Sequence, residues 1–281
     1  MKAKEARALG VEVALLVDAE QVEQAHDLLS PVLDERTPFA TLRRTGGPIG
    51  AGQMDPPGPE YDRRVNRFLE RVAADKTEGG WVIIASALEG QLDRDLSGAL
   101  ARCRGYVIAA DVWYGADIFG EGVVGQALVC HFAAALEQLG PWRQDANAWV
   151  RRAVGTGTHF WAKRSRGADH LTPEAQTLLA FLEPMFVEWD MRAVKGVGWG
   201  LKTLGRYYPD LVADWLAQEI VPGQRRHRAL MLRKALTHLS DEQRACALGI
   251  DLSGHARERR APWLRDHDTA SGEGVQHEGG G

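Results

Sequence analysis

Two side chains of complementary chemistry, Trp113 and Asp117, stand four residues apart in the segment 112–117. Residues four apart share one face of a helix, so a helical segment here brings an indole and a carboxylate to one surface. The carboxylate attracts cations by its charge and the indole attracts them through its π face. The pair therefore predicts a site for a cationic ring system. The plainer interpretation is that Asp117 is an exposed helix acid or a cap for a neighbouring turn.

Two later segments, residues 147–153 and 195–202, each combine a Trp with basic residues in a helical pattern. The members of these two segments are Trp149, Arg151, Arg152, Lys195, Trp199 and Lys202. The chain contains nine Trp, and the usual role of a Trp is packing in the core. We expect that core role for Trp81, Trp161 and Trp215. Aromatic side chains, cations and one acid thus recur together in three places.

These three segments, in this order, resemble the DNA alkylation repair enzymes of the AlkD type, which are HEAT-like-repeat DNA glycosylases. That family carries a W-x-x-x-D motif, a later Arg and a later G-W. The most specific match runs over residues 192–212, where the family reads approximately K-x-I-G-W-x-L-R, then a short spacer and P-x-x-V. The resemblance extends over residues 60–239. Two positions depart from it, because the family commonly has an acid at Tyr114 and an Arg-type residue at Lys202.

The resemblance implies a glycosylase that acts on N3- or N7-alkylated purines in duplex DNA. Asp117 and Trp113 then form the catalytic pair, and Trp199 and Tyr114 contact the lesion. Cleavage of an N-glycosidic bond develops positive charge on the deoxyribose, and a nearby carboxylate stabilises that charge and positions the attacking water. The resemblance also implies a monomer that uses no cofactor and no metal.

The same resemblance assigns a phosphate contact beside the lesion to Arg152. Lys195, Lys202 and Arg151 extend this track along the DNA backbone, where such contacts fix the register without reading sequence. For Arg151 taken alone, a solvated helix charge is the simpler interpretation. We also considered residues 225–228, a run of basic residues, as a further clamp or as a surface turn.

Two other functions fit parts of the pattern. Some relatives in the family bind DNA structures without excising a base, and the presence of both Trp113 and Asp117 argues against that function here. A HEAT-like protein-interaction scaffold is the second alternative. It predicts a concave face that is apolar instead of cationic.

The bulk composition describes an ordinary soluble protein, with 281 residues, 44% hydrophobic residues and 26% charged residues. No apolar stretch approaches the ~20 residues of a membrane span, and no secretory signal is apparent, so we expect a cytoplasmic protein that joins the nucleoid when bound to DNA. Three widely spaced Cys argue against a disulfide framework and a zinc site. The nine His form no metal-binding spacing.

Charge is distributed unevenly along the chain. Residues 143–234 contain fifteen Lys or Arg against nine Asp or Glu, which is a local charge of +6. Because the whole chain carries −4, the remaining residues carry −10. Such asymmetry favours a surface that faces a polyanion, although a solvated helix surface explains it equally well.

The hydrophobic spacing predicts an all-α fold of antiparallel helix pairs, about forty residues per pair, stacked as a HEAT-like curved superhelix. We expect divergent N-terminal helices over residues 1–43, a loop over 44–59, the repeat domain over 60–250 and a disordered tail over 251–281. The loop is expected because Gly and Pro are dense there. The expected helices cover residues 61–74, 80–92, 96–103, 106–119, 122–139, 147–163, 173–186, 189–207, 210–218 and 225–239.

Two glycine-containing segments, residues 155–157 and 196–198, superficially suggest phosphate-binding loops. No strand pattern precedes either of them, and neither completes a phosphate-loop motif. Close packing between helices is therefore the better explanation for both.

Overall fold

The computed structural model describes residues 2–34, 36–52, 57–220 and 226–250, and this part of the chain contains helices and no strand. The predicted all-α class is confirmed. The elements are α1 Ala3–Asp18, α2 Val22–Asp34, α3 Phe39–Ala51, α4 Pro59–Ala74, α5 Glu78–Glu89, α6 Leu96–Ala110, α7 Trp113–Phe119, the π-helix η1 Gly120–Gly125, α8 Gln126–Cys130, α9 Phe132–Leu139, η2 Gly140–Gln144, α10 Ala148–Ser165, η3 Asp169–Leu171, α11 Thr172–Leu182, η4 Glu183–Val187, α12 Met191–Tyr207, α13 Pro209–Glu219, α14 Arg226–Ala235, η5 Leu236–His238 and α15 Asp241–Leu248.

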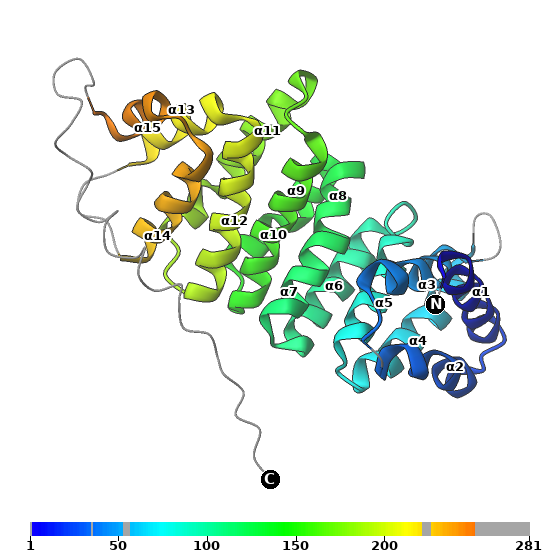
Figure 1. Ribbon diagram of the computed structural model, residues 1–281. Coiled ribbons are helices and arrows are strands. Elements are labelled where there is room, and N and C mark those ends of the chain that lie inside the picture. The colour runs from blue at the N-terminus through cyan, green and yellow to red at the C-terminus, as the bar shows by residue number, and fades with distance from the viewer. Residues whose placement is uncertain (1, 35, 53–56, 221–225, 251–281) are drawn as a thin grey trace, which may run out of the picture.

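The helices lie side by side along one elongated array (Figure 1). One row of neighbouring helices runs from α3 through α5, α7 with η1, α10 and α12 to α14. Intervening helices, among them α6, α9, α11 and α13, form a second row against the first. The apolar faces of the two rows meet in a continuous core, to which Trp81 and Trp161 belong as expected, while Trp215 packs against it half-buried. Each helix pair is thus stabilised by stacking on its neighbours.

The loop expected over residues 44–59 is wrong for its first half, because α3 continues to Ala51. The glycines there serve close packing: a Cβ at Gly46 would lie 2.8 Å from the Ile83 carbonyl oxygen, and one at Gly50 would lie 1.9 Å from that of Ala87. Burial against α5 outweighs the poor helix propensity of Gly and of Pro48. Composition alone could not reveal this, since the same residues are typical of turns.

The N-terminal helices expected over residues 1–43 are α1, α2 and the beginning of α3. The β-branched run 82–84 is buried within helix α5, and the two glycine segments over 155–157 and 196–198 lie within α10 and α12. The predicted tail 251–281 lies outside the described residues, and so do the side chains of the basic run 225–228.

None of the helices described is long and apolar enough to span a membrane.

Glycines allow unusually close contact between the three helical segments in the middle of the first row. A Cβ at Gly155 in α10 would lie 2.3 Å from the carbonyl carbon of Gly196 in α12. On the other side of α10, a Cβ at Gly157 would lie 2.5 Å from the Val124 side chain in η1. Close helix packing, predicted for both glycine segments, is confirmed. It brings η1, α10 and α12 together as a rigid support.

Candidate nucleic-acid interface

Helix α7 begins at Trp113, directly after Asp111 and Val112 break the chain direction. Asp111 adopts the left-handed conformation that ends α6, with φ of 46°. Trp113 is therefore in the first turn of α7, and Asp117 follows one turn later on the same face. The indole of Trp113 is 58% exposed, which is uncommon for a residue of its size. Tyr114 holds it from the side, with the two rings edge to face at 5.8 Å.

Asp117 forms a bidentate ion pair with Arg152 of α10. The Nε of Arg152 donates to Oδ1 at 2.8 Å, and its Nη2 donates to Oδ2 at 2.7 Å. The third nitrogen, Nη1, donates to the carbonyl oxygen of Arg192 at 3.2 Å. Both side chains are largely buried, with 9% of Arg152 and 16% of Asp117 exposed. The guanidinium thus fixes the orientation of the carboxylate and keeps its charge compensated.

The hydroxyl of Thr156 is a third neighbour of the carboxylate. It lies 3.2 Å from Oδ1 of Asp117 and 2.9 Å from the carbonyl oxygen of Arg152, so its single proton is shared between two acceptors. A carboxylate accepts about four hydrogen bonds, and at most three are used here. Oδ2 therefore keeps an acceptor position for a water or a substrate group.

The π-helix η1 begins three residues after Asp117 and positions this contact. A Cβ at Gly120 would lie 2.7 Å from the Cβ of Thr156, so only Gly lets α10 approach α7 closely enough for the hydroxyl to reach Asp117. Short π-helical turns within α-helices occur frequently at functional sites. Glu121, within this turn, is a second carboxyl group near Asp117. Burial raises its pKa most strongly, and Arg43 and Lys163 oppose that increase.

Trp199 stacks on His159 of α10, with the ring centroids 3.9 Å apart and the planes at 23°. The hydroxyl of Thr203 donates to the carbonyl oxygen of Trp199 at 3.0 Å and lies 2.6 Å from Nδ1 of His159. Because that hydroxyl has only one proton, Nδ1 must be the donor to it. Burial, and secondly the charge of Lys163, lower the pKa of His159 to about 4. The imidazole is therefore neutral at physiological pH and braces one face of the half-buried indole.

Trp113 in α7 and Trp199 in α12 belong to the two helices that flank α10. Arg152, Thr156 and His159 follow each other at helical spacing, and they contact Asp117 at one end and Trp199 at the other. The separation of seven positions between Arg152 and His159 corresponds to roughly 10 Å along the helix. The structure thus joins Asp117 to α10 through Arg152, and it places the contact between α10 and Trp199 about two turns further along α10.

The predicted backbone-binding residues divide into two groups. Arg151 is engaged by Glu188, with Nε donating to Oε2 at 2.6 Å, and Arg152 is engaged by Asp117. In contrast, Lys195 and Lys202 form no ion pair within the described part of the chain, and the same holds for Lys234 of α14. We name these three residues the lysine cluster. The phosphate contacts assigned to all four sequence-predicted residues stay predictions.

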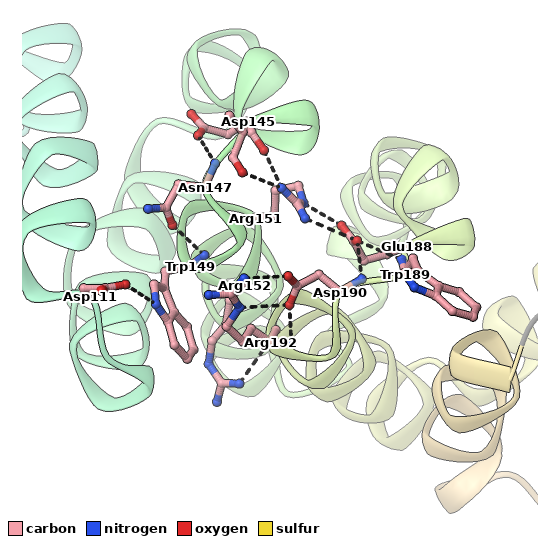
Figure 2. A network of polar contacts seen from close by, with 11 residues as sticks. Asp111, Asp145, Asn147, Trp149, Arg151, Arg152, Glu188, Trp189, Asp190 and Arg192 are labelled. Atoms are coloured by element: carbon pink, nitrogen blue, oxygen red, sulfur yellow. Dashed lines mark hydrogen bonds and ion pairs between the residues drawn. The ribbon is translucent and has the colours of Figure 1, made fainter.

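The edge of the site at the N-termini of α10 and α12 is held by a polar network (Figure 2). The indole Nε1 of Trp149 donates to Asp111 at 2.9 Å, and the guanidinium of Arg192 lies 5.4 Å from the centre of the Trp149 ring. Glu188 accepts the backbone N–H groups of Trp189 and Asp190, each at 2.8 Å, besides binding Arg151. The Trp149 ring is therefore engaged in this polar network and is not a free aromatic surface for a ligand.

Sequence reasoning missed four side chains of this face, namely Thr156, His159, Glu121 and Lys234. One signal was present, since Arg152, Thr156, His159 and Lys163 recur at helical spacing in one predicted helix. No helical spacing could connect Lys234 to these residues, because Lys234 is in α14 and they are in α10. In the described residues, no group of His, Cys, Asp and Glu has an arrangement able to hold a metal ion.

The fold and this face are those of a helical-repeat protein with an acid, aromatic side chains and uncompensated cations along one row of helices. The chain belongs to the DNA alkylation repair enzyme family, whose model matches residues 68–239. That range includes every site residue predicted from the sequence and agrees with the 60–239 expected from the motifs. Comparisons with curated proteins and with solved structures gave no match.

Proposed function

We propose that this protein is a DNA glycosylase that hydrolyses the N-glycosidic bond of N3- or N7-alkylated purines in duplex DNA. The observation that carries the proposal is the Asp117 carboxylate, oriented by Arg152 and lying one helical turn from the exposed indole of Trp113. Membership of a DNA alkylation repair family supports it.

The chemistry suits a carboxylate without a general acid. An N3- or N7-alkylated purine carries a positive charge, and it leaves as a neutral base with the electron pair of the C1′–N bond. The sugar then carries oxocarbenium character, which the Asp117 carboxylate stabilises electrostatically. Water bound at the remaining acceptor position of Oδ2 adds to C1′ and releases a proton. No cofactor or metal is required in this scheme, because the charge on the base already activates the leaving group.

The aromatic side chains select the cationic base. Trp113 offers an exposed π face next to the acid, and cation–π attraction contributes roughly 0.5–2 kcal/mol per ring. Trp199 is held by the neutral His159, so it presents its other face in a fixed orientation. Tyr114 packs against Trp113 and acts on the lesion indirectly, by holding the Trp113 ring in place. Selectivity then comes from the charge of the lesion.

DNA backbone binding is proposed for Lys195 and Lys202, whose charges are uncompensated. Arg152 acts first as a positioning residue for Asp117, and it reaches a phosphate only by giving up part of that ion pair. Arg151 stays with Glu188 in the support.

A non-catalytic DNA-binding protein is the alternative that one observation favours. Both oxygens of Asp117 are already bound by Arg152, which is also what a purely structural ion pair requires. The scaffold alternative has less support, because it predicts an apolar face and this face carries the lysine cluster.

The deciding experiment is single-turnover release of N7-methylguanine from duplex DNA by the wild type and by Asp117→Asn. We expect release by the wild type, and a loss of about 10²-fold or more in the variant with little change in DNA affinity. Asp214→Asn, which changes an exposed acid on α13, serves as the matched control. Equal rates for wild type and Asp117→Asn would remove Asp117 from the mechanism. Binding without release, also with N3 and bulky adducts, would establish the non-catalytic alternative.

A further inference from the structure

Lys234 of α14 reaches the site through a notch in α12. The two helices are neighbours (Figure 1). Gly198 faces α14, and a Cβ built on it would lie 2.6 Å from Cδ and 3.4 Å from Cβ of Lys234. Any side chain at this position would occupy the space through which the lysine stem passes. The absence of one at residue 198 therefore lets the Lys234 stem lie against α12.

The Lys234 ammonium is surrounded by like charges. Burial and the nearby Lys202, Arg152, Lys195 and Arg233, in that order, lower its pKa from the ordinary lysine value. Among these four cations, only Arg152 has an acidic partner within the described residues. The repulsion is a cost to the free protein, and within the described residues no acid forms an ion pair with Lys195, Lys202 or Lys234.

Such a cost is removed when an external anion enters. Lysine binds phosphate as a point charge, and several lysines from adjacent repeats can share one phosphodiester without reading the base sequence. The family membership makes DNA the polyanion at hand.

We propose that Lys195, Lys202 and Lys234 form a single phosphodiester-binding site on DNA, and that Gly198 exists to admit the Lys234 side chain to it. The proposal rests on DNA binding, which the proposed function also requires, but it does not depend on base excision. The site spans α12 and α14, so the DNA backbone bridges two repeats. A bound phosphate adds an attraction between the repeats at a place where the free protein brings like charges together.

The test measures affinity for an undamaged DNA duplex against salt concentration, together with the melting temperature of each free protein. Lys234→Met keeps the aliphatic stem in the notch and removes the charge. Gly198→Ala keeps every charge and displaces the stem. Lys4→Met, an exposed lysine on α1, is the matched control.

We expect Lys234→Met to bind DNA about 3- to 10-fold more weakly at moderate salt, with the slope of log affinity against log salt reduced by about 0.9. Its melting temperature is expected to stay level or rise, because repulsion is relieved. Gly198→Ala is expected to weaken DNA binding in the same direction, and Lys4→Met to change neither quantity.

A merely structural role predicts the opposite pattern, in which Lys234→Met lowers the melting temperature and leaves the salt slope unchanged. That result would overturn the proposal. The excision assay separates this site from the proposed function. If the wild type releases no base while Lys234→Met loses affinity, the phosphodiester site stands and the glycosylase fails. If the wild type excises bases and Lys234→Met binds like wild type, only the phosphodiester site fails.

Discussion

Most arginines of the N-terminal repeats and the lysines on α12 and α14 have opposite surroundings. In the first region, most arginines pair with acids, as Arg94 does with Asp62 at 2.7 Å. Further matched arginines of that region are Arg43, Arg63, Arg64, Arg67, Arg71, Arg102 and Arg104. In the second region, the lysine cluster has no such partners within the described residues.

This difference distinguishes cations that stabilise the fold through ion pairs from cations that are available to bind a ligand. A guanidinium forms bidentate bonds with a carboxylate in a fixed geometry, whereas an ammonium is a compact point charge on a flexible stem. In the described residues, arginines form ion pairs between elements, whereas the lysine cluster forms none. Arg152 lies at the border, paired with Asp117 on one side and near Lys234 on the other.

The largest expected effect on stability comes from breaking the ion pair between Arg152 and Asp117. Arg152→Met leaves the carboxylate of Asp117 largely buried without its counter-ion, and removal of one partner of a buried pair costs roughly 3–5 kcal/mol of unfolding free energy. Lys202→Met removes an uncompensated charge and is expected to cost nothing. Chemical denaturation of both variants measures the contrast. Comparable destabilisation by the two substitutions would show that the lysines are as structural as Arg152, and the distinction between the regions would fail.

A second prediction concerns His159, which faces Lys163 between the two regions. Its pKa is about 4 when folded and 6.5 when unfolded, so the unfolded chain binds more protons between these values. Stability supplied by the neutral imidazole is therefore complete above pH 6.5 and falls as the pH decreases towards 4, by at most about 3 kcal/mol.

Unfolding free energies of wild type and His159→Phe across this pH range measure the effect. The Phe ring keeps the stack on Trp199 and has no proton to bind, so the stability of the variant should fall less steeply with decreasing pH. His170→Phe, at an exposed position on η3, is the control and should follow the wild-type slope. Parallel curves for wild type and His159→Phe would refute the assignment of a neutral His159.

Most of the fold was accessible from the sequence because helical spacing of apolar residues dominates it. The error over residues 44–51 has a physical cause, since glycines that permit close helix contact have the same composition as glycines in a loop. Which of the two applies depends on the helix on the other side, here α5. That information lies in tertiary contacts and not in local sequence.

The third prediction tests the contact that joins the two regions, between α10 and α12. Gly155→Ala forces a methyl group to within 2.3 Å of the α12 backbone, and overpacking of this kind costs roughly 1–3 kcal/mol. Gly105→Ala, in α6, meets nothing within 4 Å and is expected to stabilise by about 0.5–1 kcal/mol through helix propensity. Thermal unfolding of the pair compares them directly. Stabilisation by Gly155→Ala would contradict the close α10–α12 contact.

Only part of the site could be predicted from the sequence. Motif spacing indicated Trp113, Asp117 and Trp199, and helix α7 does place the first two on one face. The partner of Arg152 was not accessible, because an arginine next to a DNA site has the same sequence signature whether it binds a phosphate or a carboxylate. Lys234 was missed because its position depends on the space left by Gly198. The partner of Arg152 and the position of Lys234 both depend on which side chains from different helices come into contact.

The smallest expected effect is that of an exposed arginine in the N-terminal repeats. Arg63 is 73% exposed on α4 and pairs with Glu60 one turn earlier. Exposed pairs of this kind contribute about 0–0.5 kcal/mol, so Arg63→Met should leave the unfolding free energy almost unchanged. It removes the same unit of charge as Lys202→Met, yet it is expected to leave the salt dependence of DNA affinity unchanged, while Lys202→Met reduces the slope by about 0.9. An equal reduction by both variants would mean that net charge alone governs DNA binding. A reduction by Lys202→Met alone would mean that the surroundings of a cation decide whether it binds DNA.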